Sequence, residues 1–382
     1  MLYNSKIIIP YPKGFDSMIS LNNPGEEAVL YALRELYRQH GYSPYKMNKF
    51  EEYDLYARNK DFLISDGVIT FTDGNGKLLA LKPDVTLSIV KNSKDSPALQ
   101  RVYYTENVYR PAKGSHCFKE LLQVGLECIG EMDAFAVDEV LSLCCESMAL
   151  ISDGSVLCVS HLGILSEVLS SVGIAAEEQP TAFRLIGERN LHELGEFLRE
   201  KSVSEQGGAL LSGLLSFRGG ADDLPALSAL LKGQVSEETL DAFVKVIGGL
   251  SEYKNLRIDF SIVNDVHYYN GFVFKGYADG ISSAVLSGGQ YDKLMKKMGR
   301  NAGAIGFAIY FDLLERFLPG QTAFDVDVVL LYDDACSLSD LKNAVKELIA
   351  NGQSVAVHKE VPKELRYRSL FVMKDGKAVE HA

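Results

Sequence analysis

Two long strand-like segments joined by a short loop constrain the fold of this chain more than any other feature of its sequence. They are RVYYTENVYR, residues 101–110, and LLQVGLECIG, residues 121–130. Side chains alternate between the two faces of a strand, so Gln123, Gly125 and Glu127 share one face of the second segment. The segments therefore predict a pair of strands, with an amide and a carboxylate in the middle of an otherwise apolar run.

These polar residues allow two interpretations. In the first, an antiparallel sheet has one face in contact with solvent, and Gln123 and Glu127 lie on that wet face. In the second, both faces are covered, and the Glu127 carboxylate needs a partner because an unpaired buried carboxylate is costly. The segment alone favours the first interpretation, and the rest of the chain bears on the choice.

Composition and cysteine spacing are those of an ordinary globular protein. The 382 residues are 47% hydrophobic and 24% charged, enough for two domains or for one large domain and a small one. No run of about 18 apolar residues is long enough for a membrane span, and the N-terminal segment lacks the features of a secretory signal. The six cysteines show no CxxC spacing, so we expect reduced thiols in a cytoplasmic protein, with neither a disulfide framework nor a zinc site.

The formal net charge of −12 bears on the choice of partner. Proteins that bind nucleic acid through its phosphates need a basic surface, because the release of counterions drives this binding. The 39 lysines and arginines are diluted among 51 acidic residues and form no basic run. We therefore expect no nucleic acid as the main partner.

Helix and strand signals predict an α+β organisation. Helices are expected at residues 87–94 and 133–151, and a β-hairpin around the DGNG turn at residues 73–76. Residues 164–253 indicate a mostly helical block, and strand character returns after it. Pro319-Gly320 marks a break in the pattern, which predicts one domain of residues 1–318 and a small β-α-β-β domain of residues 319–382.

No local motif for nucleophilic hydrolysis, metal catalysis or phosphate binding occurs in the sequence. A set of polar residues on or beside predicted strands remains. Two carboxylates suit an ammonium group, an arginine suits a carboxylate or a phosphate, and tyrosines supply walls, as an amino-acid ligand requires. The set comprises Asp84, Thr86, Arg110, Gln123, Glu127, Tyr268, Tyr269 and Tyr291.

Each member of this set also has a plain structural interpretation. Asp84 follows Pro83 and suits a turn, while the tyrosines suit ordinary strand positions. The two carboxylates are also a possible pair of ligands for a magnesium ion with waters. Taken one at a time, these interpretations are the stronger ones.

Taken together and in order, five segments resemble the histidyl-tRNA synthetase-like branch of the class II synthetase fold. ALKPDVT is similar to that family's LRPEGT, and YYTENVYR with FKELLQVGLE to its motif 2. VHYYNGFVF is similar to LDYYTGTVF, SGGQYDKL to GGRYDGL, and AIGFAIYFDLL to motif 3, VGFAMGLERL. The resemblance covers residues 8–318. It implies a six-stranded antiparallel sheet flanked by helices, the helical block as an insertion, and a histidine pocket built from the polar set.

The sequence departs from the family where the nucleotide is held. Leu313 stands in place of the motif 3 arginine, and Asn264 in place of the catalytic arginine of LVRGLDYY. Pro111 and Ala112 follow Arg110 where the family has a nearby glutamate, and His267 replaces an aspartate. The loss of one charge donor at such a site typically costs about a hundredfold in rate. The departures therefore indicate a chain without synthetase activity, and the lack of a cofactor or metal motif gives the expectation of neither.

This pattern resembles the regulatory subunits of ATP phosphoribosyltransferase, the synthetase paralogues of histidine biosynthesis. The resemblance implies a short-form catalytic subunit as partner, feedback inhibition by histidine, and a homodimer within a hetero-oligomer. It further implies that Asp84 and Glu127 receive the ammonium of histidine and that Arg110 pairs with its carboxylate. The alternatives are an atypical histidyl-tRNA synthetase and a separate amino-acid or tRNA sensor. The sequence does not choose a partner surface, a stoichiometry or a role for residues 319–382.

Overall fold

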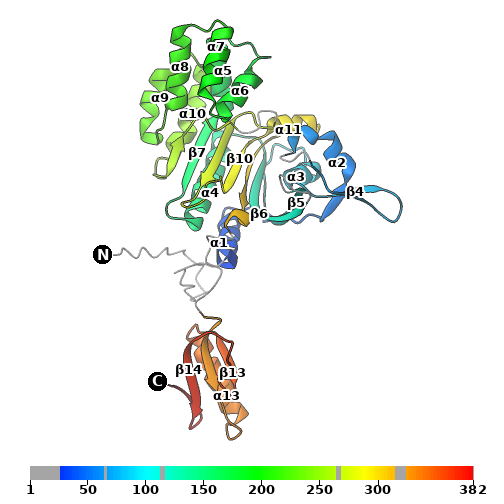
Figure 1. Cartoon of the computed structure of the whole chain (residues 1–382), viewed down its shortest axis with the longest axis vertical. Coiled ribbons are helices and arrows are strands. Elements are labelled where there is room, and N and C mark those ends of the chain that lie inside the picture. The colour runs from blue at the N-terminus through cyan, green and yellow to red at the C-terminus, as the bar shows by residue number, and fades with distance from the viewer. Residues whose placement is uncertain (1–25, 64–66, 112–116, 264–267, 315–323, 382) are drawn as a thin grey trace. The chain divides into compact units, whose positions relative to one another are not determined.

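The computed structural model describes residues 26–63, 67–111, 117–263, 268–314 and 324–381 (Figure 1). The chain divides into two compact units. Residues 29–317 form one unit, and residues 1–28 together with 318–382 form the other.

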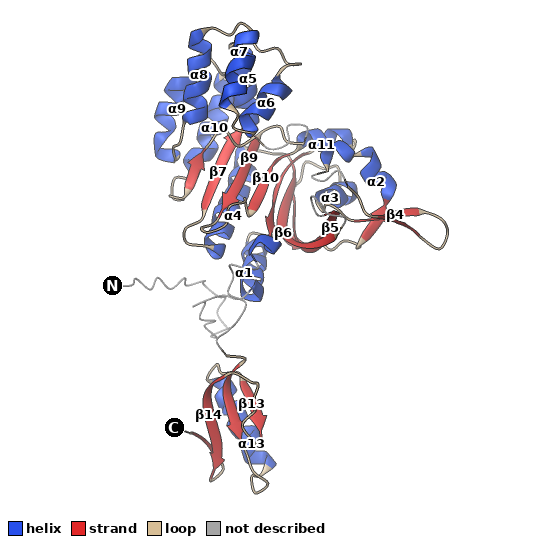
Figure 2. Ribbon diagram, viewed as in Figure 1, coloured by secondary structure: helices blue, strands red, loops and turns tan. Residues whose placement is uncertain are grey.

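An eight-stranded sheet, counted over the described residues, organises the larger unit (Figure 2). Its six middle strands run antiparallel, and one parallel strand lies at each edge. The predicted α+β fold with a central antiparallel sheet is thus confirmed, and the two edge strands are additions to the expected six. In spatial order the strands are β1 (Ser43–Pro44), β5 (Gln100–Pro111), β6 (Phe118–Gly130), β11 (Gly303–Tyr310), β10 (Leu286–Gln290), β9 (Phe272–Tyr277), β7 (Val156–His161) and β8 (Leu256–Ile258).

The two strand-like segments of the sequence form β5 and β6, which pair antiparallel along their whole length. Gln123, Gly125 and Glu127 lie on one face of β6, as the alternation predicts. That face is not wet, because Gln123 and Glu127 are each only 2% exposed. The first interpretation of these residues is therefore wrong, and the second, with both faces covered, is confirmed.

Helices cover one face of the main sheet. The ring of Tyr37 on α1 (Glu26–Gln39) meets Phe307 of β11, with centroids 6.0 Å apart. Its hydroxyl forms a 2.9 Å hydrogen bond with Ser147 on α4 (Ala134–Ile151). Gly41, at a φ of 79°, ends α1 in the left-handed conformation that glycine adopts without strain.

A smaller sheet and a short helix cover the other face, which carries Gln123 and Glu127. The smaller sheet is antiparallel, and its β3–β4 hairpin turns at the predicted DGNG segment. Residues of this layer share a buried apolar cluster with Tyr104 and Ile129 of the main sheet. The layer contains β2 (Phe50–Glu52), β4 (Leu78–Leu81), β3 (Thr70–Thr72), α2 (Tyr53–Arg58), the 3-10 helix η1 (Lys60–Phe62) and α3 (Thr86–Asn92).

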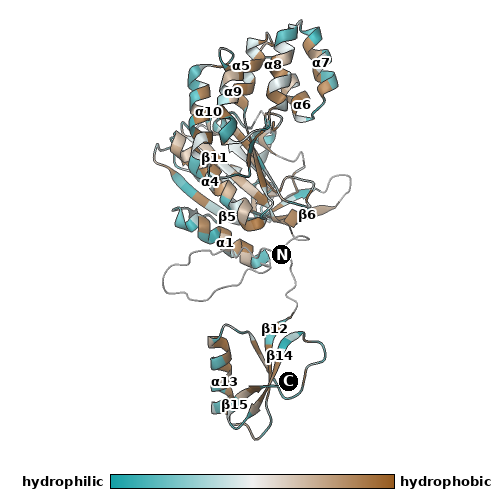
Figure 3. Ribbon diagram, turned by 90° about the vertical axis from the view of Figure 1, so that its left-hand side faces the viewer, coloured by the Kyte–Doolittle hydropathy of each residue, from teal (hydrophilic) through white to brown (hydrophobic). Residues whose placement is uncertain are grey.

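The predicted helical block gathers next to β7 (Figure 1). Polar and apolar residues alternate along its helices (Figure 3), and on α7 the buried residues are Leu194 and Leu198. The Ser236 hydroxyl caps α10 by accepting a hydrogen bond from the amide of Thr239. The helices are α5 (Leu162–Ser171), α6 (Gln179–Gly187), α7 (Leu191–Glu200), α8 (Glu205–Ser216), η2 (Ala221–Asp223), α9 (Leu224–Leu231) and α10 (Glu237–Gly249). Two further helices, α11 (Asp292–Lys297) and α12 (Phe311–Leu314), flank β11 in the sequence.

Residues 324–381 of the second unit form a four-stranded sheet with one helix. The expected β-α-β-β order is extended by one strand, because a turn at Asp375 and Gly376 folds the last strand into a hairpin. Val328, Leu330, Ala344 and Leu348 form its small core. The elements are β12 (Val326–Leu331), α13 (Leu338–Ala350), β13 (Val355–His358), β14 (Tyr367–Lys374) and β15 (Lys377–Glu380), with the sheet order β13-β12-β14-β15.

Among the described residues, no helix combines the length and the apolar character that a membrane span requires.

Candidate functional site

Glu127, near the end of β6, is the centre of a buried polar site. The Thr86 hydroxyl donates a 2.7 Å hydrogen bond to Glu127 Oε1, and the Tyr291 hydroxyl donates a 2.7 Å bond to Oε2. Both donors are neutral, and no ion pair of Glu127 occurs in the part of the chain that the structure describes. The carboxylate is thus hydrogen-bonded, but no cation among the described residues pairs with it.

The electrostatics of Glu127 follow from this arrangement. Burial raises the pKa of Glu127 to about 8, and the nearby charge of Asp84 acts in the same direction. The hydrogen bonds from Tyr291 and Thr86 oppose the shift. Near neutral pH the isolated site therefore holds mostly the protonated acid, and a bound cation would favour the carboxylate.

Two glycines make room for the polar groups on this face. Gly306 of β11 pairs with Glu127, and a Cβ atom at Gly306 would lie 1.7 Å from Glu127 Oε2. Gly125 pairs with Tyr104 of β5, and a Cβ there would lie 2.5 Å from the Tyr104 hydroxyl. A side chain at either position would collide with the site, so both glycines are steric requirements.

Asp84 lies beside Glu127 at the start of α3. Its Oδ1 accepts a 2.9 Å hydrogen bond from the amide of Leu87, so the predicted structural role at a turn is real. The side chain is also buried, and burial raises the pKa of Asp84, while the Leu87 amide and the Arg110 charge oppose the shift. Two buried carboxylates therefore share a site, and the Arg110 guanidinium is a cation near Asp84.

Two hydrogen-bond donors at this site have no partner in the part of the chain that the structure describes. Arg110 Nε donates to the carbonyl oxygen of Pro83 at 2.9 Å, which places the guanidinium beside Asp84. Among the described residues, Arg110 Nη2 and Gln123 Nε2 are buried without an acceptor. Buried donors are nearly always hydrogen-bonded, so each exception calls for an explanation. A ligand that carries an acceptor, such as a carboxylate, would satisfy both.

The predicted tyrosines come together as one wall of the site. The Tyr268 ring lies 4.6 Å from the Tyr269 ring and 5.7 Å from the Tyr291 ring, measured between centroids. Phe62 extends the wall, with a centroid distance of 5.9 Å to Tyr268. Rings at these distances form an apolar, polarisable surface on which a flat ligand group packs favourably.

Sequence reasoning missed three further tyrosines. Tyr104 and Tyr310 lie on the site face of β5 and β11, opposite Gly125 and Gln123. Tyr56 of α2 has a buried hydroxyl with no partner among the described residues, and burial together with the charge of Asp84 raises the pKa of Tyr56. The alternation within residues 101–110 contained the signal for Tyr104, once the register with Gly125 is known.

The positions that depart from the synthetase pattern are only partly described. Leu313 lies on α12 and Pro111 is the last residue of β5, so neither offers a cation to a nucleotide. Asn264 and His267, as well as Ala112, lie outside the described residues. Over the described ranges, no group of three or more histidine, cysteine, aspartate or glutamate side chains is placed to hold a metal ion.

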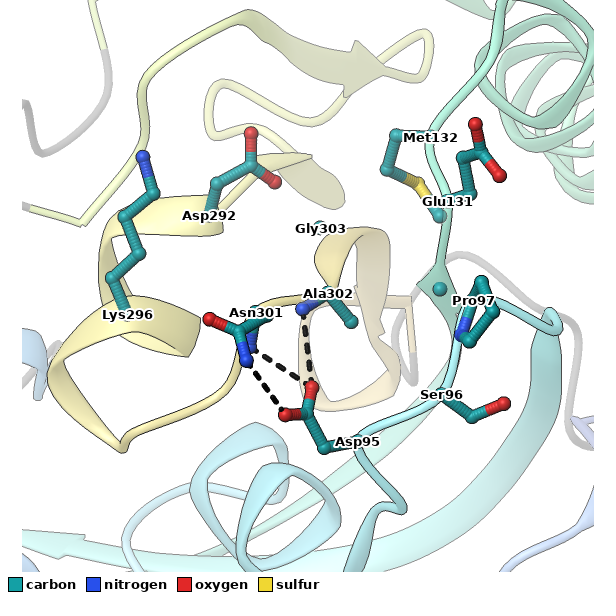
Figure 4. Close-up of a pocket in the computed structure, with 11 residues that line it drawn as sticks. Asp95, Ser96, Pro97, Glu131, Met132, Asp292, Lys296, Asn301, Ala302 and Gly303 are labelled. Carbon is teal, nitrogen blue, oxygen red and sulfur yellow. Dashed lines mark hydrogen bonds between the residues drawn. The ribbon is translucent and has the colours of Figure 1, made fainter.

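A separate cavity of about 590 Å³ lies at the ends of β6 and β11, near α11 (Figure 4). Its Asp95 carboxylate already accepts hydrogen bonds from the Asn301 and Ala302 amides and so holds the loop before β11. Glu131, Asp292 and Lys296 also line it. The cavity contains none of the predicted site residues, and it lacks the unpaired buried donors that mark the Glu127 site.

Comparison with known proteins places the chain in a family. The sequence pattern of the family described as histidyl-tRNA synthetase matches residues 24–314. The chain belongs to this family.

Individual relatives carry two different names. The ATP phosphoribosyltransferase regulatory subunit of Oceanobacillus iheyensis is 22% identical over 356 residues, which cover 90% of this chain and 87% of the relative. The histidine–tRNA ligase of Methanocaldococcus jannaschii is 28% identical over 315 residues, which cover 80% and 75%. The family thus includes proteins of both kinds, and its name alone does not select one.

Solved structures agree on the fold. The histidyl-tRNA synthetase of a Nostoc species superimposes with a TM-score of 0.72 at 18% identity, covering 99% of this chain and 97% of that one. The ATP phosphoribosyl transferase (HisG:HisZ) complex from Thermotoga maritima gives a TM-score of 0.59 at 18% identity, covering 75% and 97%. These matches support the class II architecture of the larger unit.

Proposed function

We propose that this chain is a non-catalytic regulatory subunit of ATP phosphoribosyltransferase, and that histidine binds at the Glu127 site. The observation that carries the proposal is the mixed character of the site. Two buried carboxylates, Asp84 and Glu127, share the site, and among the described residues Glu127 has no ion pair while the buried donors Arg110 Nη2 and Gln123 Nε2 have no acceptor. An amino acid supplies both, through its ammonium and its carboxylate.

Each part of histidine has a suitable partner in this arrangement. The ammonium lies between Asp84 and Glu127, with the Thr86 hydroxyl beside it. The carboxylate accepts from Arg110 and Gln123. The imidazole packs against the tyrosine wall of Tyr268, Tyr269 and Tyr291, where a flat ring fits between aromatic surfaces.

The proposed loss of synthetase activity rests on the residues at the positions that hold the nucleotide in synthetases. Adenylate formation depends on cations that stabilise phosphate charge, and Leu313 replaces the arginine of motif 3. A regulatory chain needs the amino-acid pocket without this chemistry. Relatives named as regulatory subunits, together with the solved HisG:HisZ complex, support a short-form catalytic subunit as partner within a hetero-oligomer.

Histidine can regulate a complex only if it binds one state more tightly than another. The test is phosphoribosyl-ATP formation by a short-form catalytic subunit, with and without this chain, each titrated with histidine. We expect the chain to stimulate the partner and to confer inhibition. We expect Glu127→Gln to raise the inhibitory histidine concentration at least about tenfold, because it removes a charged acceptor of the ammonium.

Glu120→Gln is the matched control, because Glu120 lies on the same strand but is exposed. Equal inhibition of both variants would place histidine elsewhere, for instance at the subunit interface. Histidine-dependent exchange of ATP and pyrophosphate by the chain alone would instead favour a synthetase. Relatives named as histidine–tRNA ligases make this second assay necessary.

A further inference from the structure

A second polar cluster lies on the same face of the main sheet as Glu127, nearer the helical block. Lys275 of β9 pairs with Cys158 of β7 on one side and with Ser287 of β10 on the other. Ser287 pairs with Ala308, which in turn pairs with Gly125. Paired residues of antiparallel strands project from the same face, so Lys275 and the Glu127 site share a face.

Four cations gather in this cluster around one carboxylate. Arg189 and Arg218 both pair with Asp259, whose amide donates to the carbonyl oxygen of Val159, next to Cys158. Burial raises the pKa of the Cys158 thiol, and the charges of Arg218, Arg189 and Arg257 oppose the shift. Lys275 is the fourth cation, and the charge of Arg189 acts on it. Arg257 is next to Cys158 in the register of β7 and β8. The cluster thus carries a formal excess of positive charge in a chain with a net charge of −12.

Asp259 forms ion pairs with two of the arginines. It is only 4% exposed, and it pairs with Arg189 Nη2 at 3.2 Å and with Arg218 Nη1 at 3.0 Å. The amide and the hydroxyl of Ser261 also donate to its Oδ1, at 2.9 and 2.6 Å. Two ion pairs and the two Ser261 hydrogen bonds occupy the Asp259 carboxylate, which helps to hold both guanidinium groups. Arg218 Nη1 also donates to the carbonyl oxygens of Leu215 and Phe217.

Lys275 has no such partner. No carboxylate within the described ranges forms an ion pair with it. Its side chain is partly buried, and burial together with the Arg189 charge lowers the pKa of Lys275. A partly desolvated ammonium beside a guanidinium is unfavourable by itself, and an anion between them removes the penalty.

The arginines of the cluster remain accessible to such an anion. The side chains of Arg189 and Arg218 are 62% and 45% exposed, although Asp259 anchors them. Arg189 also has a φ of 55°, a left-handed backbone conformation that costs a non-glycine residue free energy and concentrates at functional sites. It lies in the turn between α6 and α7, directly before Asn190, the N-cap of α7.

We propose that the cluster of Lys275, Arg189 and Arg218 binds the phosphate or diphosphate group of a small molecule. Guanidinium groups match phosphate oxygens with paired hydrogen bonds, and a lysine adds a compact charge. The acidic balance of the rest of the chain disfavours a nucleic acid. The cluster shares no residue with Arg110, Leu313 or Asn264, the positions that correspond to the nucleotide site of synthetases. The proposal therefore stands whether or not histidine binds at Glu127.

The test is isothermal titration calorimetry of the full chain at constant ionic strength. Inorganic pyrophosphate, inorganic phosphate and AMP are three separate titrants, and they distinguish a diphosphate from a single phosphate and from a phosphate monoester. We expect saturable binding of at least one. Lys275→Gln and Arg189→Gln should each weaken it at least about tenfold, because each removes a charge-assisted hydrogen bond. Lys245→Gln, on the exposed face of α10, is the control and should bind like the wild type.

Several results would overturn the proposal. These are no binding of any of the three titrants at millimolar concentration, equal binding by all variants, and Lys275-dependent binding of a single-stranded RNA without binding of the small anions. Thermal melting identifies a variant that fails to fold. If Lys275→Gln is such a variant, Arg189→Lys replaces it, because it keeps the charge but loses the paired donors. Unweakened pyrophosphate or phosphate binding by a folded Arg189→Lys would also count against the site.

Discussion

Glu127 and Asp259 are two buried carboxylates of the larger unit, and their surroundings are opposite. Glu127 accepts hydrogen bonds from two neutral hydroxyls, those of Thr86 and Tyr291. Asp259 pairs with two arginines and also accepts from Ser261. The side chains of both carboxylates are almost entirely removed from solvent.

Glu127 can therefore bind a cation that a ligand supplies, whereas Asp259 already pairs with two arginines. Burial without a cation leaves Glu127 with a raised pKa, and any ligand that brings positive charge gains from it. Asp259 has no such capacity, and it instead orients cations that are themselves available to an anion. One face of the sheet thus presents a site for an ammonium group and a site for an anion.

The largest expected effect that tests this contrast is the pH dependence of stability at Glu127. The folded-state pKa of Glu127 is raised from 4.5 to about 8. Its favourable contribution is therefore complete below about pH 4.5, falls as the pH rises, and is lost above about pH 8. Between pH 5 and pH 9 the wild type should lose up to about 4 kcal/mol of unfolding free energy relative to Glu127→Gln.

Urea unfolding of both proteins at a series of pH values measures this difference. Glutamine is tolerated at position 127 because the hydroxyls of Thr86 and Tyr291 accept hydrogen bonds as well as donate them. Glu120→Gln, on the exposed part of β6, should follow the wild type throughout. A gap between wild type and Glu127→Gln that stays constant with pH would contradict the raised pKa.

The same change from acid to amide should have the opposite result at Asp259. The introduced amide would direct an N–H group at guanidinium donors that cannot accept a hydrogen bond, so Asp259→Asn should destabilise the fold. Because the arginines are partly exposed and screened, we expect a loss of about 2 kcal/mol at pH 7, not the larger cost of a fully buried pair. Urea unfolding again measures it.

Asp241→Asn is the control for this change, because Asp241 lies on the exposed face of α10. A loss at Asp259 no larger than that at Asp241 would show that the arginine pairs are held by other contacts. It would also weaken the anion site, since the arginines would no longer need Asp259 for their positions.

Local sequence patterns predicted the helices and strands, but they did not predict contacts between residues far apart in the sequence. The alternation in residues 121–130 placed Gln123 and Glu127 on one face, which the structure confirms. Whether that face is wet depends on the layer formed by α3 and the small sheet, and nothing within the strand reports that layer. The expectation from the segment alone therefore failed.

The cluster of Lys275, Arg189 and Arg218 likewise could not be predicted from local sequence patterns. Arg189 and Asp259 are 70 residues apart and meet only because the helical block packs beside β7 and β8. Neither residue stood out in the sequence. The tyrosine wall could be predicted because the resemblance to synthetases connected segments that local patterns leave separate. The last strand of the second unit was missed because its Asp-Gly turn lay inside a run taken as one strand.

The smallest expected effect concerns two buried glutamines, and it sharpens the distinction between a binding site and a structural site. Gln179 on α6 is satisfied, because its amide group bonds to Ser166 and Ser170. Gln123 Nε2 is buried without a partner among the described residues. Methionine has a similar volume to glutamine and needs no hydrogen bond. Gln123→Met should therefore stabilise the unliganded protein, by less than about 1 kcal/mol, whereas Gln179→Met should destabilise it.

Thermal melting of the two variants, with and without histidine, makes this comparison. Gln123→Met should melt slightly above the wild type alone, yet gain less from added histidine, because a donor to the ligand carboxylate is gone. Gln179→Met should melt lower and keep the full gain from histidine. If Gln123→Met destabilised the unliganded protein as Gln179→Met does, its amide would have a structural partner. The unpaired donors of the Glu127 site would then no longer argue for a ligand.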